Sequence, residues 1–301
     1  MRLKMTTAED PVNYRYSGVL AHPTSFPSPY GIGDFGKGAY DFINFLTGAG
    51  QSLWQILPLG HTGYGDSPYQ AFSAFAGQPL LISPDELIKD GLLYGDDLRD
   101  YPHFNPDHIY YGDVIPAKLR ILHRSYEIFK ESADLCMLKE FDVFCEHEKD
   151  WLDDYALFMA VEKMWDSGIV VVAAAGNNGP GNASVTAPGI SKKIITVGAF
   201  DDKNFFSGRG PTRECIVKPE VVVTGSNIIA CNNHQGRYSS KSGTSMAAPV
   251  VSGAVARLIK NNPDITPKEV KIWMKSCCKK INVPSEKQGW GVLDIRKFVT
   301  G

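Results

Sequence analysis

The feature of this sequence that most restricts its fold is a nearly continuous apolar run at residues 168–176 (GIVVVAAAG), which ends in glycine. A strand without alternation of apolar and polar residues is typical of a parallel sheet that is covered on both faces. We therefore predict a central, fully buried parallel strand in this segment. Apolar segments at residues 194–199 and 220–223 are predicted to form further strands.

The N-terminal half shows the beginning of a similar pattern. Residues 16–25 and 52–60 are predicted to be short buried strands, because each has an apolar centre and stops at proline or glycine. Between them, Phe42 and Leu46 recur at helical spacing, which predicts a helix over residues 39–49. A strand, a helix and a strand in this order indicate the opening of a parallel α/β fold.

Three longer helices are predicted from apolar residues that recur every three or four positions. They cover about residues 115–129, 151–165 and 244–261. The residues expected on their buried faces are Ile115, Leu119, Leu122, Tyr126 and Phe129 in the first, Leu152, Tyr155, Phe158 and Met159 in the second, and Val250, Val251, Ala254, Val255, Leu258 and Ile259 in the third.

Composition and charge exclude several classes of protein. The chain has 301 residues, 43% hydrophobic and 21% charged, which is ordinary for a soluble protein of one large or two smaller domains. A net charge of -2 gives no reason to expect nucleic acid or an anionic membrane as a partner. No apolar run is long enough to span a bilayer, and the first ten residues have no signal-peptide core, so we expect a cytoplasmic protein. The oligomeric state is not predicted.

The sequence offers little support for a metal or a cofactor. The six cysteines form no CxxC pair and no Cys/His zinc spacing, so we expect reduced structural thiols and no metal. Residues 31–36 (GIGDFG) match the dinucleotide pattern GxGxxG, but the proline-containing segment 27–30 precedes them instead of a buried strand. We interpret them as a glycine-containing turn and expect no cofactor.

Residues 64–70 (YGDSPYQ) introduce the first of two family resemblances. The other segments that carry it are 17–25 (SGVLAHPTS), 29–34 (PYGIGD), 50–55 (GQSLWQ) and 57–60 (LPLG). Together they resemble the amylomaltases, which are 4-alpha-glucanotransferases. The departures are His61, Ala71 and Gln78, where that family usually has Pro, Ser and Asn. The resemblance extends from about residue 14 to about residue 159.

This resemblance implies the first part of a (β/α)8 barrel and a loop that lines sugar subsites. Tyr64 and Tyr69 would stack on pyranose rings or bond to them, and Asp66 and Ser67 would bond to hydroxyl groups. The alternative is that Asp66 and Ser67 only cap the following turn. Retaining glycosyl transfer needs two carboxylic acids across the scissile bond. In this family they lie on later strands, beyond the end of the resemblance.

Residues 242–249 (SGTSMAAP) carry the second resemblance. The segments that support it are 173–180 (AAAGNNGP), 206–212 (FSGRGPT), 218–220 (KPE) and 289–291 (GWG). They resemble subtilisin-like serine proteases, or subtilases, over about the last half of a doubly wound parallel-sheet domain. By this resemblance Ser245 is the nucleophile at a helix N-terminus and Asn177 donates to the oxyanion. The alternatives are a helix-capping serine and a turn asparagine. Residues 223–225 (VTG) depart from the usual Ala-Pro-Gly.

A serine nucleophile also needs a histidine base and an orienting carboxylate. The family supplies both upstream of the glycine-rich strand, where this chain has amylomaltase-like sequence instead. Residues 166–168 (DSG) imitate a family motif but precede the apolar strand, so we predict a helix-to-strand turn there. His61 belongs to the sugar loop, and His234 lies in a polar loop where a solvated side chain is the better interpretation.

We therefore interpret the chain as an α/β hybrid. A partial (β/α)8-barrel fragment, residues 1–160, is joined within a helix to the C-terminal half of a doubly wound subtilase domain, residues 161–301. The predicted hybrid has no complete active site. The alternative is residual 4-alpha-glucanotransferase or serine endopeptidase activity, and the candidate ligands are an α-glucan or a peptide.

Overall fold

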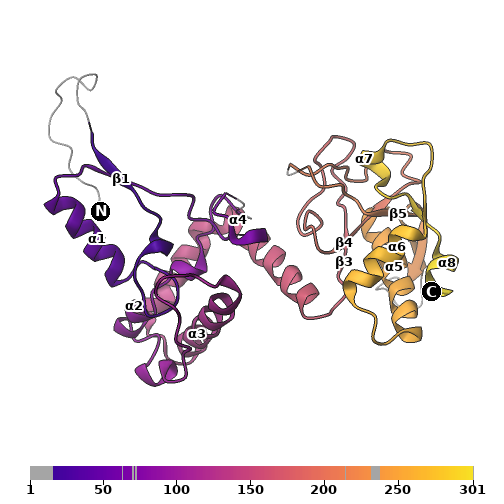
Figure 1. Cartoon of the computed structure of the whole chain (residues 1–301). Coiled ribbons are helices and arrows are strands. Elements are labelled where there is room, and N and C mark those ends of the chain that lie inside the picture. The colour runs from indigo at the N-terminus through magenta and orange to yellow at the C-terminus, as the bar shows by residue number, and fades with distance from the viewer. Residues whose placement is uncertain are drawn as a thin grey trace. The chain divides into compact units, whose positions relative to one another are not determined.

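The computed structural model describes residues 16–62, 64–69, 71, 73–213, 215–231 and 238–300. The chain forms two compact units, Met1–Asp150 and Trp151–Gly301 (Figure 1). Both contain helices and parallel strands, so the predicted mixed α/β class is confirmed. Among the described residues, no helix is long and apolar enough to cross a membrane.

The N-terminal unit contains the predicted strand, helix and strand. They are β1 (Gly18–Leu20), α1 (Lys37–Gly48) and β2 (Leu53–Gln55). The two strands pair in parallel, with Val19 opposite Trp54. Short helical segments and two long helices follow: η1 (Pro23–Ser25) lies after β1, and η2 (Tyr64–Asp66), η3 (Pro79–Leu81), α2 (Pro84–Lys89), η4 (Gly95–Leu98), α3 (Tyr111–Ser132) and the first part of α4 (Leu135–Asp166) lie after β2.

The prediction that these two strands are buried is wrong. Leu20 is 57% exposed and Leu53 is 53% exposed. Within the described residues, β1 and β2 form a sheet of two strands, and no third strand pairs with either outer edge. Parallel strands usually lie inside larger sheets that are covered on both faces. Here Phe26 and Phe42 contact Trp54 on one face, and the other face, with Leu20 and Leu53, is exposed.

Helix α3 is where a helix was predicted, but its buried face is not the predicted one. Leu119 and Tyr126 are 46% and 53% exposed. The buried residues are Val114, Ala117, Lys118, Ile121, Ser125 and Ile128. The buried face contains a lysine and a serine. A prediction from apolar residues alone therefore selected the adjacent face of the helix. Lys118 can be buried because its Nζ lies 2.9 Å from Oδ2 of the buried Asp34.

The described strands of the C-terminal unit form a sheet in the order β3-β4-β5-β9-β8. The strands are β3 (Val172–Ala174), β4 (Ile195–Ala199), β5 (Val221–Val223), β9 (Val292–Leu293) and β8 (Cys278–Lys279). The first four run parallel, and β8 is antiparallel to β9. The predicted strands at 194–199 and 220–223 are thus confirmed. The prediction that the 168–176 strand is central is wrong, because β3 forms one edge of this sheet.

The core of the C-terminal unit lies between this sheet and helix α5 (Thr244–Asn261), which packs against β3, β4 and β5 (Figure 1). As predicted, Val251 and Leu258 point into the core, where they meet Val197 and Val221. The remaining elements are the antiparallel hairpin β6 (Ile228–Cys231) and β7 (Tyr238–Lys241), with α6 (Pro267–Ser276), α7 (Ser285–Gln288) and α8 (Ile295–Thr300).

Helix α4 extends through the predicted helix at 151–165 and begins sixteen residues earlier. The boundary between the two units falls inside it, between Asp150 and Trp151. Of its residues, Val161 and Glu162 are buried. The helix ends at Asp166, and Gly168 (φ 93°) turns the chain toward β3, which confirms the predicted helix-to-strand turn.

Candidate functional site

The first candidate site lies where α5 begins in the C-terminal unit. The helix starts at Thr244, so Ser245 is its second residue, and its side chain is exposed. Gly243 precedes the helix with a φ of 155°. A Cβ atom on Gly243 would lie 3.4 Å from Nδ2 of Asn177. Glycine therefore allows both the backbone conformation and the close approach of the amide.

Asn177 is tied to the first turn of α5 by its carbonyl oxygen. Oδ1 accepts hydrogen bonds from the backbone N (3.0 Å) and from Oγ1 (3.1 Å) of Thr244. The same hydroxyl accepts a hydrogen bond from the backbone N of Gly176 at 3.1 Å. Because Oδ1 is used as an acceptor, the NH2 group of Asn177 is directed away from Thr244. The structure therefore brings Asn177 and the start of the Ser245 helix together.

This arrangement leaves donors for an anion. Within the described part of the chain, neither Nδ2 of Asn177 nor the backbone N of Ser245 has a hydrogen-bond partner. The first amides of a helix lack intrahelical acceptors, and the helix dipole favours negative charge there. The site is thus suited to bind an oxyanion, which is the chemistry that acyl transfer requires.

The described residues of the C-terminal unit include no histidine that could serve as the base for Ser245. Its Oγ has no hydrogen-bond partner among them. Six of the seven histidines lie in the N-terminal unit. The seventh, His234, lies outside the described residues. Asp166 forms an ion pair with Lys193 (2.7 Å) at the end of α4.

Asp201 is a residue at this site that sequence reasoning missed. Its carboxylate accepts hydrogen bonds from Oγ1 of Thr224 (2.5 Å) and from the backbone N of Gly225 (2.8 Å) and Ser226 (3.2 Å). Gly225 in turn accepts a bond from the backbone N of Gly243. Asp201 therefore holds the loop that supports the start of α5. The sequence signal that could have identified Asp201 is a carboxylate shortly after a predicted buried strand.

The pKa of Asp201 reflects these bonds. Burial by itself favours the neutral acid, but the hydrogen bonds from Thr224, Gly225 and Ser226 outweigh burial, and the net result is a lowered pKa. The carboxylate is therefore ionised at neutral pH and acts as a fixed acceptor.

The second candidate site is a cavity of about 180 Å³ in the N-terminal unit. It lies beside residues that follow β1 and β2, the carboxyl ends of the two parallel strands. Its polar lining residues are His22, Thr24, Ser25, Thr62, Asp66, Gln78 and Tyr111. Ligands of parallel α/β proteins commonly bind at this end of the strands.

Of the predicted sugar-loop residues, Asp66 lines this cavity. It lies in η2, where Gly65 (φ 74°) and Asp66 (φ 52°) both have left-handed backbone conformations. Tyr69 does not line the cavity and is 72% exposed. Ser67 is partly buried beside the loop, and the side chain of Tyr64 lies outside the described part of the structure. Within the described residues, neither Asp66 nor Ser67 makes a side-chain hydrogen bond.

Several polar groups of this cavity were not singled out from the sequence. Nδ1 of His22 accepts from the backbone N of Thr24 (3.3 Å), and Nε2 of Gln78 donates to Oγ1 of Thr62 (2.9 Å). Burial lowers the pKa of His22. The imidazole is therefore neutral. Burial, and then the charge of Asp66, raise the pKa of Tyr111.

Residues 31–36 form a turn, as predicted. Gly31 has a φ of 77°, and a Cβ atom on it would lie 2.5 Å from Cγ of Phe104. A Cβ atom on Gly33 would lie 2.1 Å from the carbonyl oxygen of Pro23. These glycines are explained by close packing. Among the described residues, no group of three His, Cys, Asp or Glu side chains could hold a metal ion, and all six cysteines are free.

Comparison with known families finds two different matches in the chain. A family model described as 4-alpha-glucanotransferase matches residues 21–170, and one described as the subtilase family matches residues 143–291. The chain is a hybrid of parts similar to two families. The N-terminal part of the hybrid resembles amylomaltases and its C-terminal part resembles subtilases, as predicted from the motifs.

Individual proteins show the same division of the hybrid. A 4-alpha-glucanotransferase of Synechocystis is 45% identical over 163 residues, which are 52% of this chain and 32% of that protein. Serine protease AprX of Bacillus subtilis is 41% identical over 143 residues, which are 40% of this chain and 32% of that protein. An amylomaltase structure from Streptococcus agalactiae, in complex with acarbose, has a TM-score of 0.47 and 37% identity, covering 51% of this chain and 30% of that one. The hybrid spans about a third of the length of both curated relatives.

Proposed function

We propose that the hybrid has no complete active site of either family. The observation that carries this proposal is the environment of Ser245, which has an oxyanion-type donor set but no histidine among the described residues of the C-terminal unit. Asn177 and Ser245 would be the remaining half of a protease site. Loss of the histidine from a subtilisin lowers kcat by about 10⁶-fold, because an unassisted hydroxyl is a poor nucleophile.

We propose the same origin for the fold of each unit. The N-terminal unit would be the first part of a (β/α)8 barrel, which explains the exposed strands β1 and β2. The C-terminal unit would be half of a doubly wound sheet, which explains why β3 lies at an edge. The change from one family to the other would fall near residue 160, inside the segment 143–170 that both family models match.

A fluorophosphonate probe tests the protease half of the proposal. Such a probe reacts with a serine only when its hydroxyl is activated. We expect no labelling of the full chain at neutral pH, and the same background for Ser245→Ala. Labelling of the unmodified chain that is lost in Ser245→Ala would disprove the proposal, because it would show that a base reaches Ser245.

A second function, glucan binding without transfer, is favoured by one observation. Asp66 makes no side-chain hydrogen bond within the described residues and lines a polar cavity beside the carboxyl ends of β1 and β2. Tyr64, Ser67 and Tyr69 of the same loop would supply further contacts to the sugar. The relatives named as 4-alpha-glucanotransferases make an α-glucan the natural candidate ligand.

Maltotriose separates binding from transfer. We expect saturable binding by calorimetry, and incubation should release no glucose or longer maltodextrins. Asp66→Asn should weaken binding about tenfold, whereas Asp96→Asn, on the exposed η4, should leave it unchanged. Disproportionation of maltotriose by the pure chain would contradict the absence of a glucanotransferase site, and equal binding by both variants would contradict the assigned cavity.

A further inference from the structure

The N-terminal unit contains a second, larger groove. Its volume is about 590 Å³, within the range of pockets that bind small molecules. Gln78 lines both this groove and the cavity of Asp66, and the two share no other lining residue. The other residues that line the larger groove are Phe35, Leu59, Gly77, Pro79, Leu81, Ile82, Ser83, Glu86, Leu87 and Asp90. We call this set the α2 groove, because its second half lies on helix α2 and the residues that flank it.

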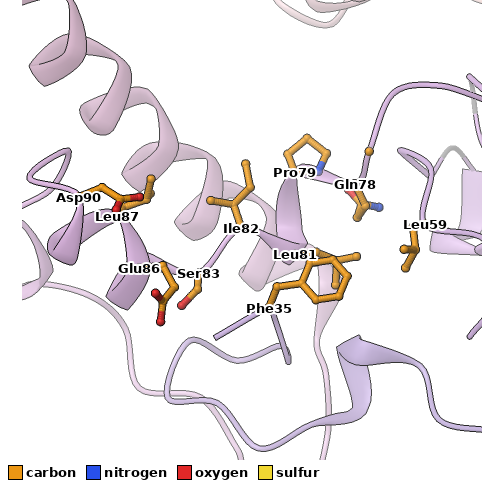
Figure 2. A pocket seen from close by; sticks show the side chains of 11 residues that line it. Phe35, Leu59, Gln78, Pro79, Leu81, Ile82, Ser83, Glu86, Leu87 and Asp90 are labelled. Carbon is orange, nitrogen blue, oxygen red and sulfur yellow. The ribbon is translucent and has the colours of Figure 1, made fainter. Parts of the chain in front are cut away.

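One part of the α2 groove is apolar. Figure 2 shows Phe35, Leu81 and Ile82 in its middle, with Leu59 and Gln78 toward one end. Phe35 is 42% exposed and Ile82 is 44% exposed. Exposure of this apolar surface to water is unfavourable in free energy. A bound apolar group would remove it from water.

The other part of the α2 groove is acidic. Figure 2 shows the Glu86 carboxylate beside the Ser83 hydroxyl, with Asp90 farther along. Glu86 forms an exposed ion pair with Lys89 (2.6 Å), but Lys89 does not line the groove. Among the described residues, Asp90 has no ion-pair partner. No lysine or arginine is among the described residues that line the groove, so this end favours a cation.

Ser83 supplies an independent indication of a ligand. It is 4% exposed, and its Oγ has no hydrogen-bond partner within the described structure. The hydroxyl is held close to Gly36, where a Cβ atom would lie 2.4 Å from it. Although Ser83 precedes α2, its side chain does not cap the helix. A buried hydroxyl without a partner is unusual, and it can accept a hydrogen bond from a ligand N–H group.

We propose that the α2 groove binds a small apolar molecule that carries a primary ammonium group. The apolar portion lies along Phe35, Leu81 and Ile82. The ammonium group lies at the end formed by Ser83, Glu86 and Asp90, where it donates to carboxylate and hydroxyl oxygens. Charge-assisted hydrogen bonds of this kind are stronger than neutral ones and select the cation over neutral or anionic analogues.

Calorimetric titration of the full chain with n-octylammonium, 1-octanol and n-octanoate at pH 7 tests this proposal. The three probes share an apolar chain and differ in charge. We expect octylammonium to bind about tenfold more tightly than octanol, and octanoate to bind most weakly. Glu86→Gln combined with Asp90→Asn should abolish the preference for the ammonium group. The matched control Asp96→Asn should retain it.

A blocking variant locates the site. Ile82→Trp adds bulk at an already exposed position of the groove, so the fold should tolerate it, and circular dichroism checks this. We expect at least a tenfold loss of octylammonium binding. Ile43→Trp, an equally exposed position on α1 outside the groove, should bind normally. Equal affinity for octylammonium and octanoate, or full binding by Ile82→Trp, would overturn the proposal. So would concentration-dependent self-association that Ile82→Trp abolishes, because a second copy would then occupy the groove.

Discussion

The side-chain oxygen of Asn177 accepts two hydrogen bonds from Thr244, 67 residues later in the chain. One comes from the backbone N at 3.0 Å and the other from Oγ1 at 3.1 Å. This pair joins the segment after β3 to the first turn of α5. It fixes which way the Asn177 amide faces, and so it keeps the donors beside Ser245 in place.

Thr244→Val should destabilise the C-terminal unit by about 1–3 kcal/mol, because the buried hydroxyl both donates to Asn177 and accepts from Gly176. Urea denaturation, with hydrogen exchange of α5 peptides as the readout, measures the loss. Ser252→Ala removes an exposed hydroxyl from the same helix and should cost less than about 0.5 kcal/mol. Equal effects of the two substitutions would show that the Asn177–Thr244 connection contributes little.

Asp201 should make the stability of the C-terminal unit depend on pH in the acidic range. Its pKa is lowered in the folded state, so its contribution is complete above the unfolded value of about 3.9 and is lost as pH falls through the folded pKa. Asp201→Asn should remove this dependence and cost about 1 kcal/mol at pH 7, because the amide is a weaker acceptor at a partly exposed site. Denaturation between pH 7 and pH 2 measures both effects. An unchanged acid profile in Asp201→Asn would assign the dependence to other carboxylates.

The buried pair of Asp34 and Lys118 should dominate the stability of the N-terminal unit. Lys118→Met leaves a carboxylate in the core without its partner and should cost about 3 kcal/mol or more. Adding Asp34→Asn should recover part of this loss, because the charge disappears while Oδ1 can still accept from the Gly36 amide. Lys37→Met breaks an exposed pair and should have little effect. Hydrogen exchange of α3 peptides measures the stability. If the double variant is no more stable than Lys118→Met, the unpaired charge of Asp34 is not the cause of the loss.

Strands β1 and β2 should promote self-association of the chain. Exposed strand edges with apolar side chains readily pair with other copies. Leu20→Lys combined with Leu53→Lys should reduce association, as measured by sedimentation velocity over a range of concentrations. Leu135→Lys, at a more exposed position on α4, is the control and should leave it unchanged. If the two charged variants behave alike, association does not proceed through the strands.

The sequence by itself determined the two family resemblances, the alternation of helices and strands, and the placement of Ser245 at the start of a helix. These features depend on local pattern: an apolar run, a three-to-four residue spacing, or a contiguous motif. Helix α5 was predicted with its correct bounds, and most of its predicted inward face is buried, because apart from Thr244 in the first turn its buried residues are all apolar.

Only the tertiary structure decided which groups could be buried and which strands would be covered. Lys118 points inward because Asp34, 84 residues away, compensates its charge, and this moved the buried face of α3 away from the apolar stripe. Likewise β1, β2 and β3 have the composition of interior strands but are left at edges, because burial requires neighbouring strands and not just apolar residues. The contacts of Asp201 with Thr224, Gly225 and Ser226, and the lining of the α2 groove, join segments that are separated in the sequence, so local pattern alone did not predict them.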